Sequence, residues 1–233
     1  MKNTILLLLG MFCLTAFGQQ ISLEDWNYQA MTNKRLLPKY GNVPRTEDEK
    51  KSDNEFIKSI LEQDFTLRKG SDHLIQLVFS YLYRDIKTAM YRFNQAFLLD
   101  STNTDIYWGY GSVYFTLGDY ARAEKQFEQG LSIDPKNTHI LTDYATCFLA
   151  QYYMLESVSE KKALENLDTA IIYMTKSYEL DPTNQNTLFK LSICYWCKSD
   201  CDNAWKFYNE CKSLGGQCIT EEFTSDLKKK CKR

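Results

Sequence analysis

Hydrophobic residues recur at helical spacing from about residue 52 to the C-terminus. They are three and four positions apart, which places them on one face of a helix. Over residues 52–69 this face consists of Phe56, Ile57, Ile60, Leu61 and Phe65. Later in the chain a longer face consists of Ala163, Leu164, Leu167, Ala170, Ile171, Met174 and Tyr178. The pattern predicts an all-α protein with a helix over 52–69, which Asp53 can cap.

The helical pattern repeats. Five positions recur after 34 residues, those of Ala89, Phe93, Leu99, Asp100 and Asn103, and their counterparts are Ala123, Phe127, Ile133, Asp134 and Asn137. Polar endings occur at 100–103, 134–137 and 181–184, so the next interval is 47 residues and contains thirteen extra. A fixed period of this length indicates stacked copies of one helical unit.

The central unit, 104–137, shows the layout most completely. Its characteristic positions are Gly111, Tyr114, Gly118, Tyr120, Ala123, Phe127 and Pro135. They resemble the W-L-G-Y…A-F…P pattern of the tetratricopeptide repeat family, whose unit is 34 residues. The resemblance implies a right-handed solenoid of helical hairpins. We expect four hairpins within 70–220, at about 70–103, 104–137, 138–184 and 185–218, followed by a capping helix at 221–233.

The N-terminus has the layout of a signal peptide. Lys2 precedes an apolar run from Ile5 to Phe17, and small residues lie at Ala16 and Gly18. We expect cleavage after Gly18 and an exported bacterial protein, periplasmic or secreted and possibly envelope-associated. A retained membrane anchor and a lipoprotein at Cys13 are the alternatives, and no later segment is long and apolar enough to span a membrane.

Residues 19–51 show no sustained period. They contain Trp26, Tyr28, Leu36 and Tyr40, more hydrophobic residues than a disordered tail usually has. We expect part of this stretch to lie against the folded body as an extended segment. The alternative is a flexible leader.

Net charge and sequence motifs limit the classes of function that we expect. The formal net charge is −2, whereas a nucleic-acid-binding protein is expected to have a basic face. The two histidines, His73 and His139, fit no metal-binding pattern, and neither a phosphate-binding loop nor a GxSxG nucleophile motif occurs. We therefore expect no enzyme activity, no cofactor and no nucleic-acid partner.

Cysteines are concentrated near the C-terminus. Seven remain after removal of residues 1–18, and six of these follow residue 190. Cys194, Cys197 and Cys201 could ligate a metal, and Cys194 and Cys197 form a CxxC pair that could be redox-active. We favour packing or disulfide formation, because Cys211 occupies the small helical position that Gly130 holds in the central unit.

The resemblance also implies a binding surface. Proteins of this family bind peptides or partner segments on a concave face built mainly from the first helix of each hairpin. Projecting the repeat onto this chain gives Tyr81, Trp108, Ser112, Phe115, His139, Thr142, Thr146, Phe189 and Trp196. These residues are aromatic or hydroxyl-bearing, unlike the Lys- and Asn-rich grooves of the family that grip a C-terminal carboxylate.

We therefore expect a non-enzymatic module that binds an apolar or aromatic segment of another protein. Three alternatives remain open. The projected residues could pack against one another or against residues 19–50. The last hairpin could hold a metal or redox site. The chain could instead be a structural subunit of an envelope complex that assembles through its convex or terminal faces.

Overall fold

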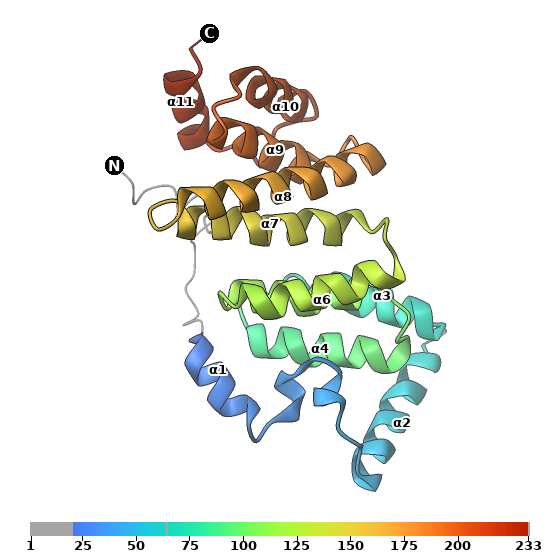
Figure 1. Cartoon of the computed structure of the whole chain (residues 1–233). Helices are drawn as coiled ribbons and strands as arrows, with labels where there is room; N and C mark the ends of the chain where they lie inside the picture. Colours follow the sequence, from blue (N-terminus) through green and yellow to red (C-terminus); the bar gives the residue numbers. More distant parts are fainter. Residues whose placement is uncertain (1–20, 64, 233) are drawn as a thin grey trace. The chain divides into compact units, whose positions relative to one another are not determined.

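The computed structural model describes residues 21–63 and 65–232, and all regular secondary structure in those ranges is helical (Figure 1). The all-α fold expected from the sequence is confirmed. The described chain divides into two compact units, residues 21–135 and 136–232. The signal peptide predicted at 1–18 lies outside the described residues. Among the helices that are described, none combines the length and hydrophobicity needed to cross a membrane.

The first unit begins with short elements and continues with two helical hairpins. Its elements are α1 (Leu23–Ala30), η2 (Lys34–Leu36), η3 (Pro38–Asn42), α2 (Glu47–Leu61), α3 (Leu67–Val78), α4 (Ile86–Leu99), α5 (Asp105–Thr116) and α6 (Tyr120–Ile133). Helices α3 and α4 form the first hairpin, and α5 and α6 form the second. Helix α4 also packs on α5, so the two hairpins are stacked.

Two glycines of α5 allow these helices to pack closely. A Cβ at Gly111 would overlap the ring of Phe127 on α6, and a Cβ at Gly109 would overlap the ring of Phe93 on α4. Both phenylalanines are fully buried. Small residues on one helix therefore receive the aromatic rings of the helices on either side.

Gly111→Ala tests this packing. The added methyl group must displace Phe127, and overpacking of a core costs about 1–3 kcal/mol, which outweighs the gain in helix propensity of just under ~1 kcal/mol. We expect a lower midpoint of thermal unfolding. An unchanged or higher midpoint would show that the Phe127 ring moves aside freely.

The predicted N-terminal boundaries need correction. The helix expected over 52–69 is α2, which begins at Glu47 because Thr46 and Glu49 form a capping box. It ends at Leu61, and Thr66 caps the next helix, α3. Gly70, the first residue after the expected end at 69, lies inside α3, where a Cβ would overlap the side chain of Ile60.

The described part of the stretch 19–51 is also not extended. From residue 21 they fold as α1, η2 and η3, followed by the start of α2. We call residues 21–46 the N-terminal strap. It packs on the body of the first unit, where Trp26, Leu36 and Tyr40 are buried. The packing of this stretch against the body was expected, but its short helices were not, because an extended segment was predicted.

The second unit contains two hairpins and a terminal helix. Its elements are α7 (Thr138–Leu155), α8 (Glu160–Leu180), α9 (Gln185–Cys197), α10 (Cys201–Ser213) and α11 (Glu221–Lys230). Helix α7 has 18 residues and α5 has 12, while α8 has 21 and α6 has 14. The extra residues of this repeat therefore lengthen both helices instead of forming a long loop.

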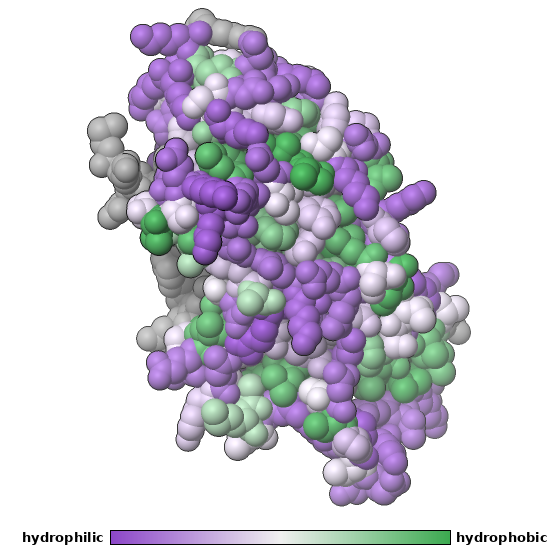
Figure 2. Space-filling model, in the orientation of Figure 1, coloured by the Kyte–Doolittle hydropathy of each residue, from purple (hydrophilic) through white to green (hydrophobic). Residues whose placement is uncertain are grey.

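The first unit exposes hydrophobic side chains at its surface. Figure 2 shows one such area where α2 ends and α3 begins, at the right of the view. Leu61 at the end of α2 is 48% exposed, and Leu67 at the start of α3 is 38% exposed.

Candidate functional site

The face of α5 that carries Trp108, Ser112 and Phe115 holds the best-placed group of predicted binding residues. Trp108 and Phe115 are half-buried. The ring of Phe79 lies 3.9 Å from that of Trp108, between centroids, and Tyr120 lies 5.3 Å from Phe115. Ser112 is buried and its hydroxyl donates to the Trp108 carbonyl oxygen at 2.8 Å. The Ser112 hydroxyl is therefore satisfied within its own helix, and the rings of Trp108 and Phe115 stay partly exposed beside Phe79 and Tyr120.

Tyr81 was predicted to lie on the first helix of its hairpin, but it lies outside any helix. Helix α3 ends at Val78, and Tyr81 lies in the turn before α4, where it is 45% exposed. This turn is longer than the one between α5 and α6, so the fixed 34-residue projection fails for the first helix of the first hairpin. Phe79, the first residue of this turn, packs against Trp108. The sequence did not predict this contact. Leu77, at the end of α3, is 50% exposed.

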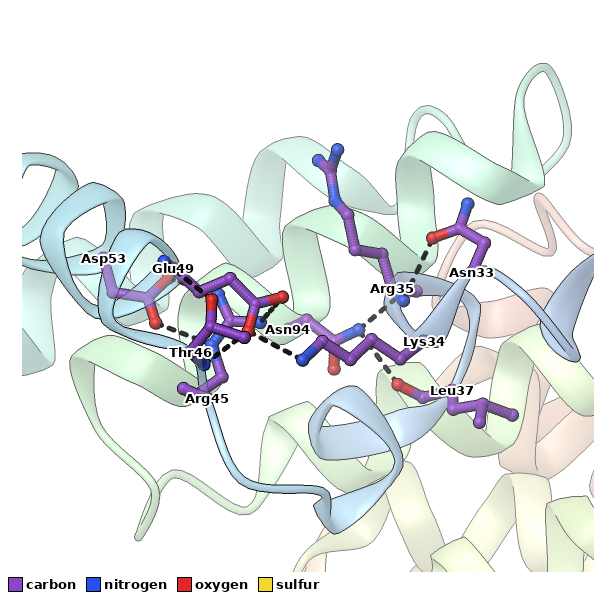
Figure 3. Close-up of polar contacts among 9 residues, drawn as sticks. All are labelled: Asn33, Lys34, Arg35, Leu37, Arg45, Thr46, Glu49, Asp53 and Asn94. Atoms are coloured by element: carbon purple, nitrogen blue, oxygen red, sulfur yellow. Dashed lines mark hydrogen bonds and ion pairs between the residues drawn. The ribbon is translucent and has the colours of Figure 1, made fainter.

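The N-terminal strap is fastened to the body by Asn94, a fully buried residue of α4 (Figure 3). Its side-chain amide donates to the carbonyl oxygens of Arg35 and Leu37, at 2.9 and 3.0 Å. Its oxygen accepts from the Tyr110 hydroxyl at 2.7 Å. The same hydroxyl accepts from the backbone N–H of Lys39 at 3.1 Å. Burial raises the pKa of Tyr110 well above its usual value, so its hydroxyl remains a donor at neutral pH.

The strap turns sharply at η3. Lys39, Tyr40, Gly41 and Asn42 all have positive φ, between 54° and 72°. A left-handed backbone costs a non-glycine residue roughly 1–2 kcal/mol. Burial of Tyr40 and contacts of the Lys39 ammonium group offset this cost. That group lies 4.6 Å from the centre of the Tyr107 ring and donates to Gln129 of α6.

Ion pairs join the strap to α2, as Figure 3 shows. Lys34 binds Glu49 at 2.7 Å, and Arg45 binds Asp53 at 2.7 Å. The hydrogen bond from Lys34, followed by that from the Thr46 backbone N–H, lowers the pKa of Glu49 from 4.5 to about 2.

This pKa shift predicts an acid-sensitive link. Because the folded-state pKa of Glu49 is depressed, its contribution to stability is present above pH 4.5 and is lost as the pH falls towards 2. Glu49→Gln should flatten the dependence of the unfolding midpoint on pH in this window. Glu55→Gln, at an exposed position of the same helix, should leave it unchanged. Equal pH profiles for wild type and Glu49→Gln would contradict the assignment.

The strap lies mainly on α4 and also reaches α6. Its elements η2 and η3 both pack on α4, and Asn27 accepts a hydrogen bond from Arg122 of α6. Helices α4 and α6 are the second helices of their hairpins, whereas the predicted binding face belongs to the first helix, α5.

In the second unit, three predicted residues are part of the core. Thr142, Thr146 and Phe189 are 2%, 4% and 9% exposed. The Thr142 hydroxyl lies 2.9 Å from that of Ser177 and 2.7 Å from that of Thr187, and Thr146 donates to the Thr142 carbonyl. The hydroxyl groups of Thr142, Ser177 and Thr187 satisfy one another, that of Thr146 is satisfied by a backbone carbonyl, and none of them is available to a partner. The prediction that they contact a partner is wrong.

Helix α11 covers Phe189 and Trp196. The Phe223 ring lies 5.3 Å from Phe189 and 6.1 Å from Trp196. Lys230 lies 4.6 Å from the centre of the Trp196 ring and donates to the Trp196 carbonyl oxygen. The terminal helix therefore occupies the face that the repeat frame assigned to a partner. His139 is exposed at the start of α7.

The three cysteines considered as metal ligands have separate partners. Cys201 forms a disulfide with Cys231, which ties the start of α10 to the end of α11. Cys194 is buried 3.7 Å from the Met174 sulfur, and the Cys197 thiol lies 3.3 Å from the Tyr153 hydroxyl. Over residues 21–63 and 65–232, no three histidine, cysteine or acidic side chains are grouped to hold a metal.

Comparison with known proteins identifies the repeat. The family model described as "Tetratricopeptide repeat" matches residues 104–137 and 150–184. The chain contains tetratricopeptide repeats. The first match is the α5–α6 hairpin, and the second covers the end of α7 and all of α8. Tetratricopeptide-repeat proteins are in general non-enzymatic scaffolds that bind protein or peptide partners, so the chain carries a protein-interaction module.

Other similarities are distant. The chain is 22% identical over 180 residues to the RNA polymerase-associated protein CTR9 of Caenorhabditis elegans, a match that covers 72% of this chain and 15% of that protein. It therefore spans a small part of this relative. The structure of a human IFIT1 dimer with PPP-AAAA matches 76% of the chain and 49% of its own, at a TM-score of 0.51 and 14% identity. A MamA structure matches 73% of the chain and 88% of its own, at a TM-score of 0.46 and 16% identity.

Proposed function

We propose that the tetratricopeptide repeats of this chain bind an apolar or aromatic segment of another exported protein, on the α5 face around Trp108 and Phe115. The observation that carries this proposal is the position of the two half-buried rings one helical turn either side of Ser112. Both lie on the first helix of the repeat at 104–137, which the family model matches over both of its helices.

The chemistry of this face suits an apolar segment. The α5 residues on it are aromatic or hydroxyl-bearing and carry no positive charge to hold a carboxylate. Exposed Leu77 and Tyr81 extend the hydrophobic character into the adjoining turn of the first hairpin. Aromatic side chains that combine a large contact area with few rotatable bonds dominate binding energy at protein interfaces.

The position of the strap is consistent with binding on the face around Trp108 and Phe115. The strap packs on α4 and reaches α6, and its Lys39 contacts Tyr107 and Tyr110 of α5. These α5 residues are not the ones proposed to meet the partner, so a segment bound at Trp108 and Phe115 would not have to displace these contacts.

Export is supported by two independent features. Residues 1–18 have the layout of a signal peptide, and the Cys201–Cys231 disulfide is of the kind that persists in oxidising compartments. We propose a periplasmic or secreted location.

Site-specific photocrosslinking in the native envelope tests the proposed face. A photoreactive residue at position 115 should capture a partner protein, and the same residue at Ile172 should not. Ile172 is 66% exposed on α8, so it controls for random collision. Equal capture at both positions, or none at position 115, would exclude the α5 face as the binding site.

A second candidate function is assembly into an envelope complex through the end of the first unit. It is favoured by the exposed hydrophobic area at Leu61 and Leu67. The same experiment separates the two functions, because this candidate predicts capture at position 67 and none at position 115.

A further inference from the structure

Two cysteines of the last hairpin lie side by side without being bonded. Cys211 is buried near the end of α10, and Cys218 is half-buried in the segment that leads to α11. Their sulfur atoms are 3.4 Å apart. Both thiols also point to the carbonyl oxygen of Gln185 at the start of α9, at 3.4 and 3.2 Å.

The backbone holds this arrangement in place. Gly215 and Gly216 have φ of 113° and 64°, which reverses the chain after α10. The N–H of Gly216 donates to the Cys211 carbonyl oxygen at 3.0 Å. The Gln185 side chain binds both sides of the turn: it donates to the Leu214 carbonyl at 2.8 Å and accepts from the Gln217 N–H at 3.0 Å. A disulfide needs sulfurs about 2.0 Å apart, so small rotations of the two side chains would suffice.

We propose that Cys211 and Cys218 form a second disulfide that closes the turn between α10 and α11. The remaining unbonded cysteines of the described chain are placed differently. Cys194 lies 3.7 Å from the Met174 sulfur, and Cys197 faces the Tyr153 hydroxyl at 3.3 Å. The bonded pair is therefore Cys211 and Cys218, not the CxxC pair that the sequence makes conspicuous.

The oxidation proceeds by exchange with a small-molecule disulfide such as oxidised glutathione. The Cys218 thiolate, the more accessible of the two, attacks one sulfur of glutathione disulfide, and that S–S bond breaks to release one glutathione thiolate. The Cys211 thiolate then attacks Cys218 Sγ, breaks the mixed disulfide and releases the second. Two cysteine thiols are oxidised, one glutathione disulfide is reduced, and the two thiol protons end on the two glutathione molecules.

The surroundings favour a structural bond over a catalytic one. Burial raises the pKa of Cys211 to about 12, and burial also raises the pKa of Cys218, which the hydrogen bond from Cys211 partly opposes. Catalytic dithiols instead stabilise a thiolate and have low pKa values. We expect the bond to form slowly and, once formed, to resist reduction.

Peptide mapping of the full chain tests the proposal directly. After equilibration with oxidised glutathione, acid quenching, alkylation and tryptic digestion without reductant, Lys212 allows cleavage between the two cysteines. Most of Cys211 should be recovered in a cross-linked product of peptides 207–212 and 213–228, which reduction separates. The known bond, joining peptides 199–206 and 231–232, serves as the internal control.

The same peptide map also identifies the result that would contradict a Cys211–Cys218 bond. Recovery of Cys211 and Cys218 as separate alkylated peptides, while the 199–206 and 231–232 peptides remain joined, would overturn the proposal. Cross-linking of either residue to another cysteine would also overturn it. In the matched variant Cys218→Ser the product should be absent, which verifies its assignment without depending on partner binding.

Discussion

Asn94→Ala is expected to lower the free energy of unfolding of the first unit by about 3 kcal/mol, because it removes three hydrogen bonds and takes the acceptor from a buried hydroxyl group. The carbonyl oxygens of Arg35 and Leu37 lose their donor, and the Tyr110 hydroxyl loses its acceptor. For a chain of this size the loss corresponds to a fall of roughly 6–12 °C in the unfolding midpoint.

The N-terminal strap should respond before the rest of the unit does. With its fastening removed, residues 33–45 should exchange their amide hydrogens faster and be cleaved more readily by trypsin, while α5 and α6 remain protected. The matched control is Asn54→Ala, at an exposed position of α2, which should change stability by less than about 0.5 kcal/mol. Wild-type stability in Asn94→Ala would show that this network does not hold the strap.

The central repeat could be predicted because its signals are local. Gly111, Ala123 and Phe127 recur at the family spacing, and each is explained by contact between helices that are adjacent in sequence. The start of α2 also has a local signal, since Thr46 and Glu49 have the spacing of a capping box. This signal lies within the charged run at residues 45–51, which has no hydrophobic periodicity to indicate a helix. The same locality explains why the extra residues of the third repeat extended helices that were already predicted.

The strap could not be predicted in the same way. Helix α1 has an N-cap at Ser22 but only eight residues, and the turn at Lys39 and Tyr40 is left-handed at two non-glycine residues. Both depend on contacts with α4, α5 and α6, more than fifty residues away. The partners of Asn94 are backbone carbonyls, which leave no trace in residue identity.

The partial exposure expected of the predicted binding residues is found where the repeat is regular. Trp108 and Phe115 lie in the central unit and are partly accessible as expected. Tyr81 was misplaced because α3 ends at Val78 and leaves it in a longer turn, and Phe189 and Trp196 lie under α11. A sequence projection gives the face of a helix, whereas its accessibility depends on which later element packs there.

Trp108→Ala is expected to weaken partner binding by about 2 kcal/mol, or roughly 30-fold in Kd, which is the size typical of an interfacial tryptophan. The substitution also removes the contact with Phe79, so a stability loss of about 1 kcal/mol is expected. Unfolding should nevertheless remain cooperative and helix content unchanged, because the core rings of Phe93 and Phe127 stay in place. Loss of the cooperative transition would assign Trp108 to the core instead.

The matched control is Tyr28→Ala, which removes an aromatic side chain that is 75% exposed on α1, in the same unit. It tests whether any exposed ring of the first unit contributes to binding. We expect wild-type affinity and a nearly unchanged unfolding midpoint for this variant.

The most direct test of the account is therefore a calorimetric titration of wild type, Trp108→Ala and Tyr28→Ala with the partner captured at position 115. We predict a loss of roughly 30-fold in affinity for Trp108→Ala alone, with cooperative unfolding preserved in all three proteins. Equal affinity of wild type and Trp108→Ala would contradict binding on the α5 face.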